Sequence, residues 1–294
     1  MLPSFAKRDS PGEIAQSISG RDYLSWSQVD QMRRCPAKYG FGYVEQSKPA
    51  FLPSSLLFGS AIHSALEHHF QQLLEGRLTS QRELMAVFMD EWRRRDNEDP
   101  DVPVRFNKSE SEASLIELAQ RMLAAFLISP LANPQGQIIA VEEKLRGCLK
   151  ASLPDVVARV DAIWLDRQAM HVIDFKTSRS RWNADKVNES ADQLLLYHHM
   201  AQSMSRHTGL PIKLHFGVIT KGKAPVVQLL DVPVSAGRVE RVVNLIEQVW
   251  QAIKAGHYYP SPSPMNCSTC PFKSRCPAYG DPVHAAMHSE HVAS

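Results

Sequence analysis

Two neighbouring segments constrain the fold most, because both predict buried strands and one of them carries charge at closely spaced positions. They are DVVARVDAIWL (155–165) and AMHVIDFK (169–176), whose Val and Ile content is typical of strands. Side chains on a strand alternate between faces, so Asp174 and Lys176 point the same way, ~7 Å apart. Burying a carboxylate and an ammonium group is unfavourable without further compensation. The pattern therefore predicts a sheet with a charged face that has a chemical role.

The turn between these strands determines which residue lies opposite Asp174. A loop of two residues (167–168) or of four (166–169) places Asp161 there, whereas a one-residue change in loop length would move Asp161 to the other face. A solvated ion cluster on a surface hairpin is one explanation, but the flanking residues are apolar. Two hard oxygen ligands for a divalent metal such as Mg2+ fit better, with Lys176 beside them to position or activate a water. Metal and lysine together can stabilise the negative charge of an attacked phosphodiester.

The first half of the chain predicts helices. Ser25 and Gln28 have capping-box spacing and Pro36 follows Cys35, so a short helix is expected between Ser25 and Cys35. Apolar residues at helical spacing predict three further helices, at about 56–74, 81–95 and 111–128.

The period then changes to that of strands. Beyond the central pair, strands are expected at 137–145, 212–220 and 225–231, a helix at about 184–206, and a last helix with Val239, Val242, Ile246, Val249 and Ile253 on one face. Helices followed by a hairpin-built sheet with a crossover helix indicate an α/β fold with a sheet of mixed direction.

Composition and cysteine count limit the setting of the protein. The chain has 294 residues, 44% hydrophobic content and a net charge of +2, which neither demands nor excludes a polyanionic partner. No apolar run reaches the ~20 residues that a membrane span needs, and the start shows no signal-peptide pattern. Five cysteines, an odd number, argue against a disulfide framework and for a reducing compartment. We therefore expect a cytoplasmic protein without membrane contact.

Four of the cysteines are candidates for metal ligands. Cys267, Cys270 and Cys276 have C-x2-C-x5-C spacing, and Cys35 lies over two hundred residues upstream. Structural zinc is one alternative, held by the four cysteines or by three of them with His284 or His288. An iron–sulphur cluster is the other, since it also takes thiolate ligands. The fifth, Cys148, is expected to be a small buried hydrophobic residue.

Six segments, two of which form a pair, resemble the motifs of the PD-(D/E)XK nuclease superfamily in the family's order, over roughly residues 24 to 277. RVDAIWL and HVIDFKT are similar to its paired catalytic motifs, FGSAIHSALE (58–67) to its histidine-bearing helix, and QLLLY (193–197) to its Gln-x-x-x-Tyr motif. LSWSQVDQMRRCP (24–36) and CSTCPFKSRCP (267–277) look like the two halves of a cluster-binding site. The nearest resemblance is to RecB/AddB-type nuclease domains and the CRISPR-associated adaptation nucleases.

The resemblance implies a restriction-endonuclease-like fold, with a mixed central sheet flanked by helices. Residues 1–20 are polar and contain Pro, Ser and Gly, so we expect a flexible leader there. A single nuclease domain (21–280) and a flexible tail (281–294) are expected to follow. The domain would contain a helical insertion (about 75–135) and a C-terminal cluster-binding segment (267–276). A 4Fe–4S cluster held by Cys35, Cys267, Cys270 and Cys276 would join the N- and C-terminal segments.

The resemblance also implies a function: a Mg2+- or Mn2+-dependent deoxyribonuclease, an exonuclease on single-stranded DNA ends that serves DNA repair, recombination or CRISPR adaptation. His63, Asp161, Asp174 and the Phe175 carbonyl are the implied metal ligands. Lys176 is the implied catalytic lysine, with Gln193 and Tyr197 positioning it or the phosphate. Arg179 and Arg181 would grip the DNA backbone.

The sequence is compatible with more than one answer on three points. Glu142 and Glu143 both lie on the strand before Asp161, and alternation does not tell which one approaches the metal. The chain contains no P-loop, so a helicase would be a separate partner, as would a CRISPR integrase. The alternative function is a non-catalytic DNA-binding or assembly module on a nuclease fold.

Overall fold

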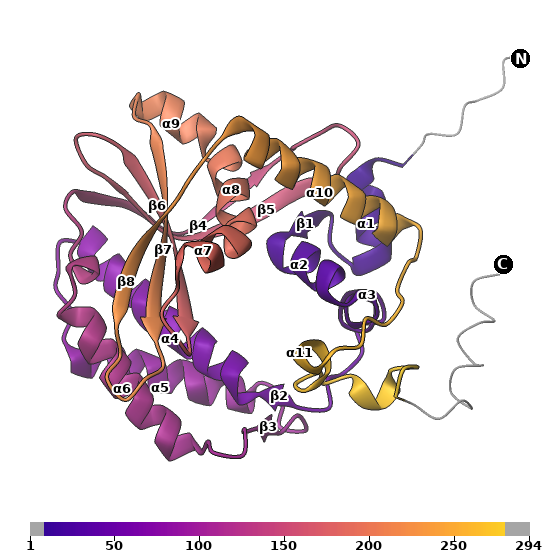
Figure 1. Ribbon diagram of the computed structural model, residues 1–294, viewed down its shortest axis with the longest axis horizontal. Coiled ribbons are helices and arrows are strands. Elements are labelled where there is room, and N and C mark those ends of the chain that lie inside the picture. Colours follow the sequence, from indigo (N-terminus) through magenta and orange to yellow (C-terminus); the bar gives the residue numbers. More distant parts are fainter. Residues whose placement is uncertain (1–8, 280–294) are drawn as a thin grey trace, which may run out of the picture. The chain divides into compact units, whose positions relative to one another are not determined.

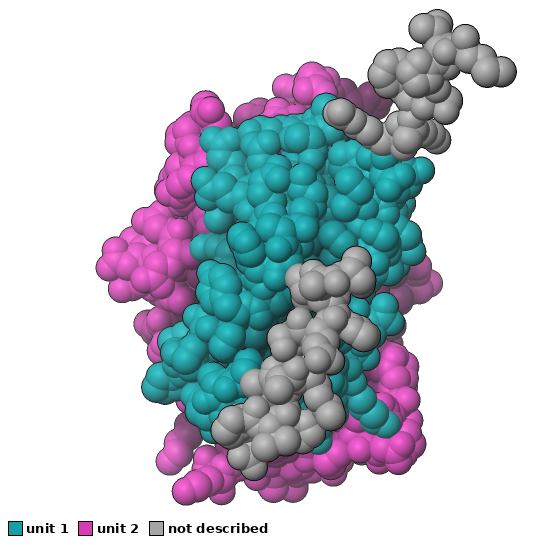
Figure 2. Space-filling model, turned by 90° about the vertical axis from the view of Figure 1, so that its right-hand side faces the viewer, with its two compact units in different colours: residues 1–50, 146–157, 243–294 teal, residues 51–145, 158–242 magenta. Residues whose placement is uncertain are grey.

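The described residues form two compact units. The computed structural model of the protein describes residues 9–279. Unit 1 comprises residues 1–50, 146–157 and 243–294, and unit 2 comprises residues 51–145 and 158–242 (Figure 2). The sequence predicts one domain over residues 21–280 and does not anticipate this division into two units. The predicted tail at 281–294 and the first eight residues of the predicted leader lie outside the described residues.

Unit 2 contains most of a mixed sheet, as the sequence predicts. Its strands are β4 (Gln137–Gly147), β5 (Asp155–Leu165), β6 (Met170–Ser178), β7 (Ile212–Thr220) and β8 (Val227–Val232). The spatial order is β5-β6-β7-β8, and β4 also pairs with β5 (Figure 1). Strands β6 and β7 are parallel, whereas β5–β6 and β7–β8 are antiparallel. The start of β5 belongs to unit 1, where it pairs in parallel with β1 (Tyr23–Ser25).

The register between β5 and β6 is the predicted one. Ala162 pairs with Ile173 and Leu165 with Met170, so the next position along places Asp161 beside Asp174. The turn is closed by the Asp166 amide, which donates to the Ala169 carbonyl at 3.1 Å. The four-residue loop thus determines which face of the sheet carries the two carboxylates.

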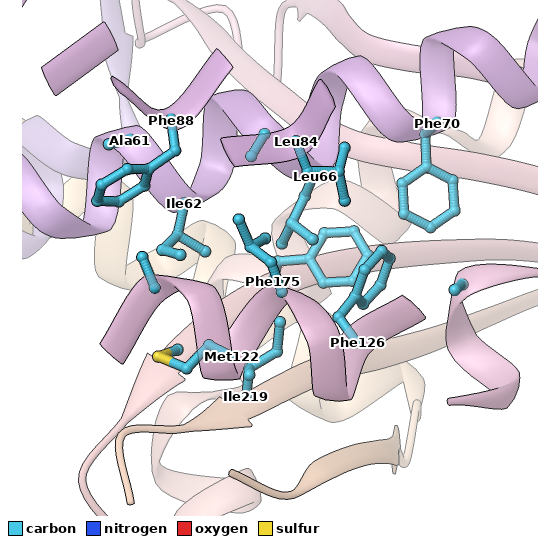
Figure 3. Packing of buried hydrophobic residues seen from close by; sticks show 14 of the residues in the cluster. Ala61, Ile62, Leu66, Phe70, Leu84, Phe88, Met122, Phe126, Phe175 and Ile219 are labelled. Carbon is cyan, nitrogen blue, oxygen red and sulfur yellow. The ribbon is translucent and has the colours of Figure 1, made fainter. Parts of the chain in front are cut away.

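Three long helices cover one face of the unit 2 sheet. They are α4 (Ser54–Leu74), α5 (Gln81–Asn97) and α6 (Glu112–Leu127), close to their predicted bounds. The ring of Phe175 on β6 packs between Phe70 of α4 and Phe126 of α6, with ring centroids 5.3 and 6.2 Å apart (Figure 3). Much of the segment expected as an insertion therefore belongs to the core, because buried residues of α5 and α6 pack in this cluster. Strands β2 (Leu52–Pro53), which precedes α4, and β3 (Val104–Arg105), which follows α5, form a short parallel pair.

The crossover between β6 and β7 is broken into three helices, where a single helix over 184–206 was expected. They are α7 (Ala184–Ser190), α8 (Asp192–Met200) and α9 (Gln202–Thr208), with breaks at Ala191 and Ala201. Four consecutive residues of α8, from Leu194 to Tyr197, are buried, whereas α9 buries none. One straight amphipathic helix buries a single stripe along its whole length. It therefore cannot be buried on all sides over residues 194–197 and bury no residue over α9.

Unit 1 contains a helix within the segment expected as a flexible leader. Helix α1 (Pro11–Ser19) begins with a capping box between Ser10 and Glu13 and ends at Gly20, whose φ is 69°. These local signals are sufficient to start and stop a helix, so the expectation is wrong for this stretch. The predicted helix near residues 25–35 is confirmed as α2 (Trp26–Arg34), with Ser25 and Gln28 forming the expected capping box.

The remaining helices of unit 1 are short or shared. Helix α3 (Pro36–Tyr39) continues into a π-helical turn (Gly40–Val44), and α11 (Pro264–Cys267) precedes a 3-10 turn (Lys273–Arg275). Helix α10 (Ala236–Lys254) begins in unit 2 and continues into unit 1. No helix within residues 9–279 is both long and apolar enough to cross a membrane.

Gly217 makes room for the Phe175 ring and yields a stability prediction. The two residues are register partners, and a Cβ at Gly217 would lie 2.6 Å from Phe175 Cδ1. We expect Gly217→Ala to lower the free energy of unfolding by about 1–3 kcal/mol, because the ring is packed on its other sides. Gly59→Ala on α4 is the control, because its Cβ would meet nothing within 4 Å and alanine favours a helix by up to about 1 kcal/mol. Denaturant titration of both variants measures the difference, and equal stabilities would contradict the packing argument.

Candidate active site

Asp161, Asp174 and Lys176 lie together on the charged face of β5 and β6. Asp161 Oδ2 accepts a hydrogen bond from the Phe175 amide at 2.6 Å. Asp174 is only 2% exposed, and its Oδ2 lies 2.7 Å from Lys176 Nζ. That contact is an ion pair rather than an aligned hydrogen bond, because Asp174 Oδ2 is buried and accepts no well-oriented hydrogen bond. A carboxylate oxygen that is buried and accepts no hydrogen bond favours the binding of a further cation beside it.

Lys176 is held from the helix side by the Gln-x-x-x-Tyr pair of α8. Its ammonium donates to Gln193 Oε1 at 2.9 Å, and Gln193 Nε2 donates to the Tyr197 hydroxyl at 2.6 Å. Burial, with the charges of Asp174 and Asp161, raises the pKa of Tyr197 well above its ordinary value. The tyrosine therefore stays protonated and orients the glutamine amide, which in turn orients the lysine.

His63 approaches the carboxylates from α4. Its Nδ1 lies 3.6 Å from Asp161 Oδ2, and the backbone of Phe175 is a hydrogen-bond partner of the ring. Burial lowers the pKa of His63 and outweighs the opposing effect of Asp174. A neutral imidazole beside a carboxylate is a suitable metal ligand rather than half of an ion pair. The predicted set of His63, Asp161, Asp174 and the Phe175 backbone is thus brought together by two strands and one helix.

Two further carboxylates belong to the same electrostatic cluster. Burial, Asp161 and Glu67 raise the pKa of Glu142 to about 7. Burial and Asp174 likewise raise the pKa of Asp161, against the hydrogen bond from Phe175. Of the two glutamates left open by the sequence, Glu142 is the one whose charge interacts with Asp161 and His63. Several desolvated carboxylates in one place are typical of a functional site that accepts a cation.

The backbone explains why alternation could not select Glu142. Its φ is +51°, which is uncommon for a residue with a side chain and interrupts the regular alternation of β4. Such a conformation persists where the surrounding structure enforces it. Glu67 was missed as well, although it lies one helical turn after His63 and therefore on the same face of α4.

The chemical types of the side chains at this site fit a divalent metal, but these side chains are not arranged around a common metal position. Within residues 9–279, no three His, Cys, Asp or Glu side chains are arranged to hold a metal ion. Carboxylate oxygens, a neutral imidazole and a backbone carbonyl are nevertheless ligands that Mg2+ and Mn2+ accept. Asp161 and Asp174 now face the Phe175 amide and Lys176, so metal binding requires these side chains to reorient.

The two predicted DNA-binding arginines differ in their surroundings. Both Arg179 and Arg181 are exposed, just beyond the end of β6. Arg179 lines a cavity together with Lys221 of the β7–β8 turn, whereas Arg181 does not.

The four predicted cluster cysteines lie around one space in unit 1, but within the described residues no three of them are arranged to hold a metal ion. Cys35, Cys267, Cys270 and Cys276 line one cavity, together with Phe41, Pro260 and Pro262 and with two lysines, but no acidic residue. The neighbouring thiols and, above all, burial raise the pKa of Cys276. The surrounding segments are joined independently: Asn266 Nδ2 donates to the Arg34 carbonyl at 2.8 Å, and Phe41 packs on Phe272 with ring centroids 5.8 Å apart.

The expectation that Cys148 is a buried residue is wrong. It is exposed rather than buried, because it follows the end of β4 and no longer lies on a core-facing strand. His284 and His288, the alternative zinc ligands, lie outside the described residues.

The fold and this cluster define the class of protein as a nuclease with an acid-and-lysine site on a mixed sheet. The chain belongs to the PD-(D/E)XK nuclease superfamily, whose family model matches residues 23–277. Nucleases of this family generally use divalent metal ions such as Mg2+ to hydrolyse phosphodiester bonds. A comparison with curated proteins finds no match.

Several solved structures are similar to the chain, among them the following two. A crystal structure described as a "Putative exonuclease" from Eubacterium rectale has a TM-score of 0.53 and 14% identity, covering 90% of this chain and 91% of that chain. At this identity the likeness concerns the fold alone. The structure of SSO0001 has a TM-score of 0.36 and 14% identity, covering 87% of this chain and 96% of that chain.

The contact between Gln193 and Lys176 yields a prediction with a matched control. We expect Gln193→Ala to lower kcat for DNA hydrolysis about 10-fold or more, because a hydrogen bond to a charged group contributes about 1.5–3 kcal/mol. Gln202→Ala is the control, since Gln202 lies on α9 and its Nε2 contacts the His198 ring at 3.2 Å rather than Lys176. Initial rates on end-labelled DNA give the comparison. Equal losses in both variants would mean that the Gln-x-x-x-Tyr match is coincidental.

Proposed function

We propose that the protein is a metal-dependent deoxyribonuclease that acts as an exonuclease on single-stranded DNA ends. The observation that carries this proposal is the position of Lys176, held between Asp174 and Gln193 on the strand beside Asp161. A lysine held in this way next to two desolvated carboxylates has the charge and the geometry to assist attack on a phosphodiester.

His63, Asp161, Asp174 and the Phe175 carbonyl would hold the Mg2+ or Mn2+ ion, with Glu142 close to this set. When bound, the ion supplies positive charge to the phosphate oxygens and lowers the pKa of a coordinated water. Asp161 and Asp174 supply the negative charge that binds it, and the neutral His63 contributes a ligand without competing charge.

The remaining residues act on the water and on the phosphate. Lys176 orients the attacking water and offsets the negative charge that develops on the phosphate oxygens in the transition state. Gln193 and Tyr197 fix the direction of the Lys176 ammonium, so little reorganisation is needed as the charge develops.

The preference for single-stranded ends and the biological setting rest on the resemblance of the motifs to RecB/AddB-type domains and CRISPR-associated adaptation nucleases. In such a setting the enzyme works in the cytoplasm on DNA that a separate helicase unwinds, or trims DNA for an integrase partner. The four cysteines around one cavity support a 4Fe–4S cluster in unit 1, since soft thiolates are the ligands that such clusters use.

A non-catalytic binding module is the competing function. Binding DNA needs exposed cations, and it does not need desolvated carboxylates, which repel a phosphate backbone. The raised pKa of Asp161 indicates that this cluster costs folding free energy when charged. A chain that only bound DNA would gain nothing from this cost, and so we favour the enzyme.

Metal removal tests the proposal. We expect EDTA to abolish degradation of DNA labelled at either end, and added Mg2+ or Mn2+ to restore it, because the carboxylate cluster cannot otherwise approach a phosphate. Single-stranded linear, double-stranded linear and circular single-stranded DNA should be compared, and labelled products reveal which end is attacked.

The outcomes separate the alternatives. Undiminished hydrolysis in chelated buffer would overturn the metal mechanism. Cutting of circular single-stranded DNA would replace the exonuclease assignment by an endonuclease one. Binding without cleavage under any metal condition would favour the non-catalytic module.

A further inference from the structure

A cavity of about 520 Å³ in unit 2 is lined mainly by cations and hydroxyl groups. Arg121 of α6, Arg179 after β6, and Lys221 and Lys223 of the β7–β8 turn contribute four positive charges, against the single carboxylate of Glu110. This volume is within the range of small-ligand sites. The excess of positive charge indicates an anionic occupant.

The one carboxylate is already engaged by protein donors. Glu110 Oε2 accepts from Ser54 Oγ and from Asn107 Nδ2, each at 2.8 Å. Burial opposes its charge, but these hydrogen bonds keep the pKa of Glu110 below its ordinary value. It therefore supports the wall of the cavity and neutralises only part of the positive charge.

Lys221 is the central cation of this cavity. Its amide donates to the Ser178 carbonyl at 2.7 Å, which joins the β7–β8 turn to the end of β6. Its ammonium lies 4.8 Å from the centroid of the buried Phe58 ring. Burial lowers the pKa of Lys221, and Arg179 lowers it further against the attraction of Glu110. A bound anion would relieve both unfavourable effects.

Two elements that carry the active site also reach this cavity. Arg179 follows Lys176 by three residues, one beyond the end of β6, which corresponds to at most about 10 Å of chain. Phe58 precedes His63 by five residues on α4, a rise of about 7.5 Å. Both paths are short, so a nucleic-acid strand bound at Lys176 can continue into the cavity.

We propose that this cavity binds the phosphate backbone of the single DNA strand that occupies the active site, a few nucleotides from the cleaved bond. This inference rests on the proposed function for the direction of the strand, while the binding site itself is defined by its own residues. The aromatic ring in the lining, Phe58, is fully buried and its face is covered by Lys221, so no base stacks on it. Binding is therefore through phosphates and independent of base sequence.

Affinity for single-stranded DNA, measured without metal, tests the site separately from catalysis. Fluorescence anisotropy of labelled oligo(dT) in EDTA should show that Lys221→Gln raises Kd about tenfold and lowers the slope of log Kd against log salt by about 0.7. Arg121→Gln, on the exposed surface of α6, should act in the same direction, and Lys221→Arg should retain most of the affinity. Oligo(dA) should give the same ratios as oligo(dT).

Lys213→Gln is the matched control, because Lys213 is exposed and lies near the start of β7, paired with His171, whereas Lys221 follows the end of that strand. If Lys221→Gln and Arg121→Gln change affinity and salt slope no more than this control, the inference is overturned. It is also overturned if the wild type does not bind single-stranded DNA.

Cleavage assays separate this inference from the proposed function. With Mg2+, Lys221→Gln should raise KM for a ~10-nucleotide strand by a much larger factor than KM for a dinucleotide, since a dinucleotide does not reach the cavity. An equal loss on both substrates would overturn the inference while leaving the nuclease intact. A wild type that cleaves nothing, but whose DNA affinity depends on Lys221, would overturn the nuclease proposal and support the binding site.

Discussion

We expect Lys176→Ala to lower kcat for DNA hydrolysis by about 10²–10³-fold, the loss that follows from removing one preorganised electrostatic contact with the transition state. The ammonium lies 2.7 Å from Asp174 Oδ2 and 2.9 Å from Gln193 Oε1, so its position beside the carboxylates is set before the substrate binds. Affinity for DNA should change little, because the interaction strengthens only as charge develops on the phosphate. Single-turnover rates at saturating enzyme, with Kd from anisotropy in EDTA, measure the two effects.

Removal of Lys176 also leaves Asp174 as a buried carboxylate with no cation beside it, and this alone could destabilise the fold. Lys176→Gln therefore accompanies the alanine variant, since it keeps a donor of similar length without the charge. Thermal unfolding of both variants identifies any loss that comes from stability, and Lys186→Ala on α7 serves as a surface control. Normal cleavage with weakened DNA binding would instead make Lys176 a phosphate anchor.

The second large effect concerns the cysteine cavity of unit 1. Protein purified without oxygen should be brown with broad visible absorption if Cys35, Cys267, Cys270 and Cys276 hold an iron–sulphur cluster. We expect Cys35→Ser to bleach this absorption and to lower stability by about 4 kcal/mol or more, because a cofactor that binds only the folded state at 1,000 times its Kd stabilises it by that amount. Iron and sulphide analysis with thermal unfolding gives both values.

Cys148→Ser provides the control for this variant, since Cys148 is exposed and does not line the cavity. It should keep the colour and the stability of the wild type. Limited proteolysis of Cys35→Ser should begin in unit 1, whereas unit 2 carries the catalytic residues and its own core. A colourless wild type loaded with one zinc ion would overturn the cluster and leave the nuclease proposal standing.

The sequence alone determined the features that depend on local periodicity. Alternation along β5 and β6, combined with a four-residue turn, was sufficient to place Asp161 opposite Asp174, because register follows directly from loop length. The spacing of Gln193 and Tyr197 likewise put both on one face of a helix, where the structure joins them by a hydrogen bond. Helices with a clear cap, such as α2 after Ser25, were predicted closely for the same local reason.

Tertiary structure decided what local periodicity does not contain. Glu142 rather than Glu143 joins the carboxylates because its backbone adopts a φ of +51° within the packed sheet, which no alternation rule anticipates. The crossover helix is divided at Ala191 and Ala201 because α8 is buried by the strands it packs on and α9 is not. The positive cavity is likewise visible only in three dimensions: Arg121, Arg179 and Lys221 are each ordinary surface charges in sequence, and packing alone brings them around one space.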